Sequence, residues 1–143
     1  MITRRQDGYE VSTDTDRVDI DLVHHWLSTD AYWALGRSRE TVERSVRASL
    51  NFGVYDVHGV QVAYARVVTD AATFAWLCDV YVDRPHRGAG LGTWLATAVR
   101  DHLKPYHLRR VMLATADAHK IYAEVGFVPC PDPQHLMILR PAQ

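Results

Sequence analysis

The sequence is poor in cysteine, in net charge and in long apolar runs. Only Cys78 and Cys130 occur among 143 residues, so we expect no disulfide framework, and a metal site would have too few obvious ligands. The formal net charge of −1 gives no reason to expect a nucleic-acid partner. No run approaches the roughly 20 apolar residues that span a bilayer, and the N-terminus lacks the apolar stretch of a secretory signal. We therefore expect a cytoplasmic protein without a membrane or metal partner.

The length and composition are those of one globular domain. A chain of 143 residues can bury a substantial core but is too short for two ordinary domains. Its hydrophobic fraction of 48% and charged fraction of 23% exclude a disordered chain. No internal repeat, low-complexity tract or linker divides it. We therefore treat residues 1–143 as a single domain.

The periodicity of apolar residues predicts the element order β-α-α-β-β-β-α-β-α-β-β. The expected strands cover residues 9–12, 52–57, 60–68, 73–82, 109–115, 127–130 and 135–140. The expected helices lie around residues 18–27, from an N-cap at Ser38 to Leu50, at 91–103 and at 117–126. This order indicates an α+β domain with a mixed, mostly antiparallel sheet flanked by helices. The connection through residues 91–103 should make the strands on either side of it parallel.

A glycine-rich segment precedes one of these helices. In "RPHRGAGLGTWLATAVRDHL", residues 84–103, Gly88, Gly90 and Gly92 lead directly into an amphipathic pattern. The segment is no Walker A loop, because no Gly-Lys-Ser/Thr follows, and both registers of a dinucleotide-binding G-x-G-x-x-G fail at Thr93 or Leu95. Bare backbone amides at the positive end of a helix dipole suit a phosphate or pyrophosphate. The alternative is a tight turn without a ligand.

The stretch "VYVDRPHRGAGLG", Val80 to Gly92, resembles the acyl-CoA-binding motif of the GNAT superfamily of N-acetyltransferases. That motif joins a strand to an Arg/Gln-x-x-Gly-x-Gly/Ala loop, which Arg87, Gly90 and Gly92 match. Downstream, "IYAEVGF" is similar to the family's Leu-Tyr-x-x-x-Gly-Phe stretch. The resemblance covers nearly the whole chain in its element order and implies the GNAT fold.

The resemblance also implies a set of cofactor residues. Amides from Arg87 to Thr93 would hold the pyrophosphate of acetyl-CoA, and the backbone of Val80 and Val82 would pair with the pantetheine arm. The implied cofactor-binding residues are Val80, Tyr81, Val82, Arg87, Gly88, Ala89, Gly90, Leu91, Gly92, Thr93 and Thr115. Thr115 stands where many relatives carry an asparagine that helps to hold the arm. The family's splayed strands would admit the thioester between residues 77–82 and 111–115.

Tyr122 lies where the family places the proton donor for the departing thiolate. A phenol with a pKa near ~10 suits that task, because the thiolate has roughly similar basicity. The same tyrosine also falls on a helical stripe with Ala118, Ile121 and Val125, so core packing is the alternative.

Asp79 interrupts the apolar run "FAWLCDVYV". Because burial of an unpaired carboxylate is costly, Asp79 should face either a polar cleft or a partner. It would then bind the acceptor's ammonium or take its proton, whereas the alternative is a structural ion pair. Tyr32 and Trp33 fall in the region where the family builds its acceptor pocket, although core packing explains them equally well.

These patterns predict an acetyl-CoA-dependent N-acetyltransferase that acts by direct attack of a primary amine. Tyr122 would be the general acid and Asp79 would lie near the acceptor amine, which belongs to a small molecule or a peptide. Two alternatives stay open: a regulatory module that binds acyl-CoA without turnover, and a protein or peptide N-acetyltransferase. The resemblance also allows a homodimer.

Overall fold

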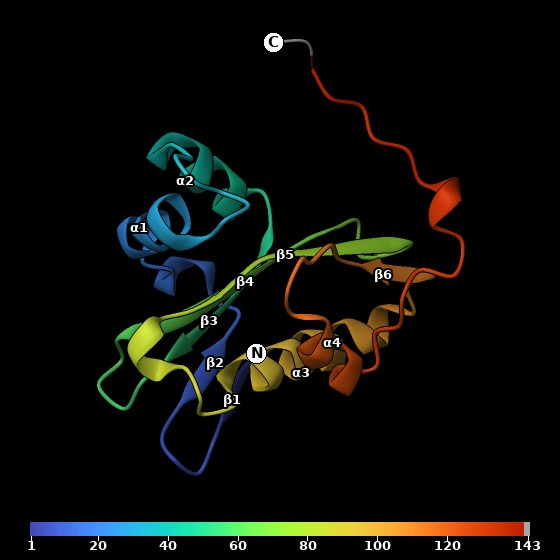
Figure 1. The fold of residues 1–143 in the computed structure, drawn as a ribbon. Helices are drawn as coiled ribbons and strands as arrows, with labels where there is room; N and C mark the ends of the chain where they lie inside the picture. The colour runs from blue at the N-terminus through green and yellow to red at the C-terminus, as the bar shows by residue number, and fades with distance from the viewer. Residues whose placement is uncertain (142–143) are drawn as a thin grey trace.

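The computed structural model describes residues 1–141 and arranges them as a twisted six-stranded sheet with helices on both faces (Figure 1). The strands are β1 (Ile2–Arg4), β2 (Glu10–Ser12), β3 (Leu50–Tyr55), β4 (Gln61–Thr69), β5 (Phe74–Val82) and β6 (Arg110–Met112). The α-helices are α1 (Ile20–Asp30), α2 (Arg39–Arg47), α3 (Leu91–Leu103) and α4 (His119–Val125). Within residues 1–141, no helix combines the length and the apolar character that crossing a membrane requires.

The strands follow one another across the sheet in chain order. Each pair from β1 to β5 is antiparallel, and β5 and β6 are parallel because α3 carries the chain over the sheet between them. The expected mixed, mostly antiparallel sheet and its parallel crossover are confirmed. The sequence did not predict β1, whose three residues are all exposed and show no alternation of apolar and polar side chains.

Two apolar cores hold the layers together. The larger core joins the sheet to α3 and α4 through residues such as Phe52, Leu77 and Leu95. The smaller core joins the opposite face to α1 and α2 through residues such as Trp26 and Tyr81. Ser38 caps α2 as predicted, since its side chain accepts a hydrogen bond from the Thr41 amide.

A β-bulge changes the face to which β5 directs its side chains. Tyr64 pairs with Tyr81 and Arg66 with Cys78, so Ala65 alone faces both Asp79 and Val80. Asp79 takes a left-handed conformation with φ 52°. Because of this extra residue, Leu77 belongs to the core under α3 whereas Tyr81, four residues later, belongs to the core under α1.

The two strands expected at residues 127–130 and 135–140 are wrong, because this stretch of the chain contains only a short 3-10 turn, Pro133–His135. Pro129, Pro131 and Pro133 interrupt the segment and remove backbone donors that a sheet needs. The segment leaves the body of the protein as an extended tail (Figure 1), in which the side chains of Met137 and Leu139 are 97% and 94% exposed.

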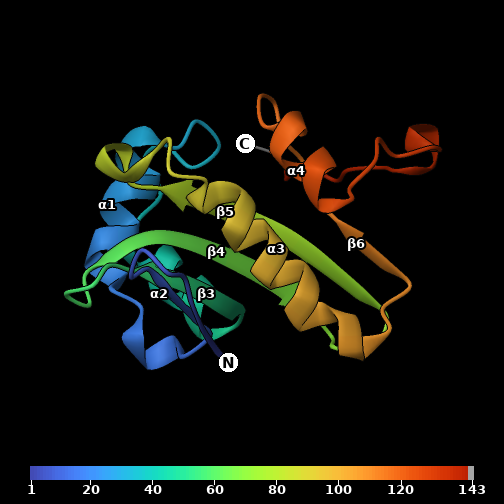
Figure 2. The same ribbon diagram turned by 90° about the horizontal axis from the view of Figure 1, so that it is seen from below.

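The parallel strands β5 and β6 stay paired over three residues only. Phe74 to Trp76 pair with Arg110 to Met112, and the chain then departs from β5 toward α4 (Figure 2). Within the described residues, the second half of β5, Leu77–Val82, therefore has no strand partner on this side. Its backbone edge is left open toward α4, as the predicted splaying requires.

Candidate functional site

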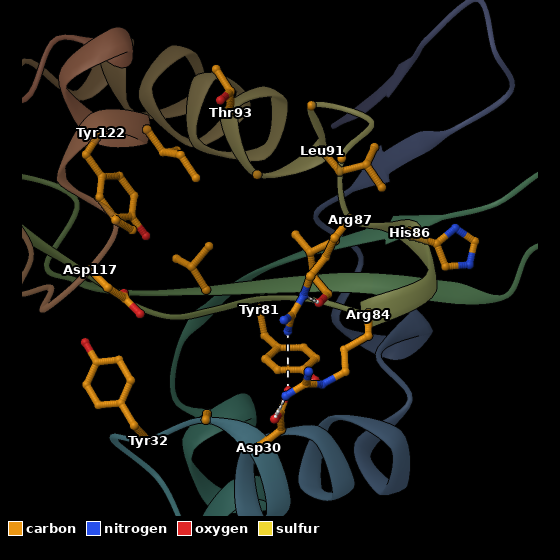
Figure 3. A pocket seen from close by; sticks show the side chains of 18 of the residues that line it. Asp30, Tyr32, Tyr81, Arg84, His86, Arg87, Leu91, Thr93, Asp117 and Tyr122 are labelled. Carbon is orange, nitrogen blue, oxygen red and sulfur yellow. Dashed lines mark hydrogen bonds and ion pairs between the residues drawn. The ribbon is translucent and has the colours of Figure 1, made fainter.

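A cavity of about 670 Å³ lies at this open edge of β5 (Figure 3). Four segments line it: the end of α1 with the loop that follows, the second half of β5, the glycine loop with the first turn of α3, and the start of α4. The predicted cofactor residues that line it are Val80, Tyr81, Val82, Arg87, Gly88, Gly90, Leu91, Gly92 and Thr93. The structure therefore brings the glycine loop, the open strand edge and Tyr122 into one cavity.

The glycine loop forms the wall at the N-terminus of α3. Gly88 and Gly90 have φ values of 88° and 76°, which L-residues with a side chain rarely adopt. A Cβ at either position would meet no atom within 4 Å, so space in front of the backbone is open. Gly90 is the N-cap of α3 and leaves the first amides of this helix without side-chain partners. Such amides, with the positive end of the helix dipole, form a site for an anion.

The N-terminal hairpin supports this loop from behind. Arg5 Nη2 donates a hydrogen bond of 3.0 Å to the Ala89 carbonyl, and the Arg5 guanidinium lies 5.3 Å from the centre of the Trp94 ring. The Tyr9 hydroxyl lies 2.8 Å from His86 Nδ1. Ala89 itself does not line the cavity, and its contact with the cofactor stays a prediction. The sequence around the loop does not predict this contact, because more than 80 residues separate Arg5 from the loop.

A group of charged residues closes the same end of the cavity. Asp30, at the end of α1, accepts hydrogen bonds from Arg84 and, over 2.6 Å, from the Tyr81 hydroxyl. Arg87 Nη2 lies 3.4 Å from the same carboxylate, while its Nε donates to the Val82 carbonyl over 2.8 Å. The hydrogen bonds from Arg84 and Tyr81 lower the pKa of Asp30 to about 2. Asp30 is therefore a carboxylate whose charge these arginines already balance.

Tyr122 lies at the opposite end of the cavity. Its ring packs edge-on against Phe127, with ring centres 5.8 Å apart, and only 9% of the residue is exposed. Its hydroxyl points into the cavity (Figure 3), and no hydrogen bond to a residue within 1–141 contributes to its pKa. Burial, followed by the nearby Tyr32 and Asp117, raises the pKa of Tyr122 to about 12. The phenol is therefore protonated at neutral pH and free to donate.

The prediction that Asp79 faces the acceptor is wrong. Asp79 is 3% exposed and lies outside the cavity, and Trp33 Nε1 donates to its Oδ1 over 2.9 Å. Its Oδ2 accepts from Arg37 Nη1 at 2.8 Å and Arg66 Nε at 2.9 Å. Burial raises the pKa of Asp79, but Arg66, Arg37 and Trp33 together hold it below its usual value. Asp79 thus forms the structural ion pair that the sequence left as the alternative, and it anchors Trp33.

The acceptor end of the cavity holds the two predicted aromatic residues and a carboxylate that the sequence did not single out. Tyr32 and Trp33 pack edge-to-face with ring centres 5.0 Å apart, and both line the cavity. The Tyr32 hydroxyl accepts a hydrogen bond of 2.9 Å from the Ala116 amide. Asp117, next to Ala116, also lines the cavity (Figure 3).

Thr115 does not line the cavity, and its contact with the cofactor stays a prediction. Its Oγ1 instead accepts a hydrogen bond of 3.0 Å from the Ala118 amide and a longer one from the Asp117 amide. Thr115 therefore shapes the turn that leads into α4 and presents Asp117. Among residues 1–141, no three His, Cys, Asp or Glu side chains gather as a metal site would require.

Comparison with known proteins adds independent information. A sequence profile described as the acetyltransferase (GNAT) family matches residues 20–127. A curated Gibberella zeae protein whose name places it among the acetyltransferases is 32% identical, over 81% of this chain and 76% of that protein. A crystal structure of a GNAT-family protein from Xanthomonas campestris pv. campestris is 47% identical and covers 93% of both chains with a TM-score of 0.88.

A solved structure with much lower sequence identity is also similar in fold. The N-acetylglutamate synthase of Neisseria gonorrhoeae, solved with coenzyme A and N-acetyl-glutamate, is 16% identical to this chain. It matches 91% of this chain and 30% of its own length with a TM-score of 0.71. At this identity the likeness concerns the fold alone, and it agrees with the fold class that the sequence predicted.

Proposed function

The chain belongs to the acetyltransferase (GNAT) family, and from this premise we propose that it transfers an acetyl group from acetyl-CoA to a primary amine. One observation carries the proposal. A single cavity joins an anion site, formed by the glycine loop, to the unpartnered hydroxyl of Tyr122. An anionic, elongated acyl donor and a proton donor can thus meet in one place.

The residues present fit acetyl-CoA. The amides between Arg87 and Thr93 suit its pyrophosphate, because Gly88 and Gly90 leave the backbone accessible and α3 adds its dipole. The open edge of β5 at Val80 and Val82 has no strand partner and offers backbone groups to the amides of the pantetheine arm, although the Val82 carbonyl also accepts from Arg87 Nε. In the distant N-acetylglutamate synthase, coenzyme A is present in a protein of the same fold.

Acetyl-CoA supplies an acyl group activated as a thioester. For the amine to attack, its nitrogen must be neutral, and the departing sulfur is a better leaving group when it receives a proton. Tyr122 holds such a proton at the cavity wall, and its pKa of about 12 keeps it there at neutral pH. Cys78 and Cys130 lie outside the cavity, and burial raises the pKa of Cys78 to about 11. These positions favour direct attack by the amine over an acyl-cysteine route.

Incubation of the purified protein with acetyl-CoA and a panel of primary amines tests the proposal. We expect release of the free thiol together with the mass of an acetylated amine. Saturable binding of acetyl-CoA without acetylation of any small amine or peptide would instead favour a regulatory module that binds acyl-CoA.

The glycine loop gives a sharper prediction through Gly90→Val. A side chain at φ 76° shifts the loop amides, and the loss of a hydrogen bond to a charged phosphate should raise the Kd for acetyl-CoA by about 10- to 100-fold. Calorimetric titration measures this Kd.

Gly59→Val is the matched control for that measurement. Gly59 has φ 79° and equally open surroundings, but it lies in the turn between β3 and β4, outside the cavity. Both substitutions should cost about 1–2 kcal/mol of stability through the left-handed backbone, whereas only Gly90→Val should weaken binding. Equal affinity in both variants would remove the loop from the cofactor site.

A further inference from the structure

We propose that Tyr32, Trp33 and Asp117 form an acceptor subsite that takes a small amine carrying a second positive charge, such as a diamine. The inference rests on the proposed acetyl transfer and names the class of its acceptor. One ammonium group lies against the Asp117 carboxylate, while the other amino group, in its neutral form, faces Tyr122.

The charges of the cavity are separated between its two ends. The cationic and titratable side chains Arg84, His86 and Arg87 line the end at the glycine loop. Of the two carboxylates that line the cavity, Asp30 is balanced by Arg84 and Arg87. Asp117 has no ion pair or side-chain hydrogen bond within residues 1–141, and it lies beside Tyr122 and Tyr32 rather than beside the arginines (Figure 3). The end for an anionic donor is thus positive, and the acceptor end is negative.

The aromatic walls beside Asp117 are held in place. The Ala116 amide fixes the Tyr32 hydroxyl from the far side of the cavity, and the buried Asp79 fixes the Trp33 indole. The two residues nevertheless remain 51% and 42% exposed. Exposed aromatic rings beside a carboxylate attract a cation, and rings that are already fixed lose little freedom when it binds.

The chemistry of the attack explains why the acceptor needs two amino groups. A carboxylate stabilises the charged form of a neighbouring amine and raises its pKa. If Asp117 held the only amino group of the acceptor, it would keep that group in the protonated form, which cannot attack. A second ammonium resolves this conflict, because it satisfies Asp117 and leaves the attacking nitrogen free to lose its proton.

The test compares three amines of similar length: 1,4-diaminobutane, 1-aminobutane and 4-aminobutanoate. For the wild type, we expect kcat/KM for 1,4-diaminobutane to exceed that for 1-aminobutane by about tenfold or more, the effect of one charge-assisted hydrogen bond. The value for 4-aminobutanoate should be the lowest, because its carboxylate would face Asp117. Asp117→Asn should abolish the preference for the diamine, so that kcat/KM for 1,4-diaminobutane falls to the level of that for 1-aminobutane.

Glu124→Gln is the matched control, because it removes a carboxylate from exposed α4 surface outside the cavity. This variant should retain the preference for the diamine. Calorimetric titration of the protein with 1,4-diaminobutane in the presence of coenzyme A provides a second readout without turnover. Its affinity should fall with Asp117→Asn and stay unchanged with Glu124→Gln.

The possible results separate this inference from the proposed function. Equal acetylation of all three amines, or an equal loss for all of them in Asp117→Asn, overturns the subsite and leaves acetyl transfer intact. Asp117-dependent binding of the diamine without acetylation of any amine supports the subsite and overturns the transferase. If the diamine does not bind and no amine is acetylated, both the subsite and the transferase are overturned.

Discussion

Replacement of Tyr122 by phenylalanine is expected to lower kcat by about 10²- to 10⁴-fold, the usual contribution of a positioned general acid. The substitution removes one oxygen and retains the ring that packs against Phe127. Because no hydrogen bond to a residue within 1–141 involves the hydroxyl, its removal leaves no buried group unsatisfied. The affinity for acetyl-CoA and the midpoint of thermal unfolding should therefore stay unchanged. Steady-state kinetics, calorimetric titration and thermal melts measure the three quantities.

The raised pKa of Tyr122 also fixes the pH dependence that we expect for the loss in Tyr122→Phe. Since burial raises the pKa of Tyr122 to about 12, the acid form is present throughout the assayable range below that value. The ratio of wild-type to Tyr122→Phe kcat should thus be constant between neutral and mildly alkaline pH. Tyr106→Phe, at a half-buried tyrosine outside the cavity, should retain full activity. A Tyr122→Phe enzyme with undiminished kcat would remove the phenol from the mechanism.

Features that depend on neighbouring residues were predictable from the sequence. Three glycines directly before an amphipathic run placed the loop at the start of α3, where Gly90 adopts the left-handed conformation. Gly126 ends α4 in the same conformation, as its position after the helical pattern predicted. In both cases the backbone itself restricts which residue is tolerated, so the signal is local.

Features that depend on distant contacts were not predictable. Alternation along "FAWLCDVYV" cannot show that a bulge at Asp79 exchanges the two faces of β5, because the extra residue is defined only by pairing with β4. Asp117 likewise becomes part of the cavity through the turn that Tyr32 contacts from 84 residues away. A solvated carboxylate and a site carboxylate look the same in sequence, and the structure separates them by what surrounds each one.

Asp79→Asn is expected to lower the free energy of unfolding by about 3–5 kcal/mol, because it leaves the largely buried Arg66 without a counter-charge. Chemical denaturation at neutral pH measures the loss. Asp21→Asn is the control, since Asp21 pairs with Arg39 on the surface with 79% of its side chain exposed, and its loss should leave the midpoint unchanged. Because Asp79 also anchors Trp33, the remaining folded enzyme should show a raised KM for the amine and an unchanged KM for acetyl-CoA.

The sign of the pH dependence tests whether the ion pair is the cause of this stability. Arg66, Arg37 and Trp33 outweigh burial and hold the pKa of folded Asp79 below the ordinary value of 3.8. A carboxyl whose pKa is lower in the folded state stabilises the fold above its unfolded pKa, and this contribution disappears as the pH falls through the folded value. The difference in stability between wild type and Asp79→Asn should therefore be constant above about pH 5 and shrink below the ordinary aspartate pKa. A difference that persists unchanged in acid would mean that the charge of Asp79 is not the source of its stabilising effect.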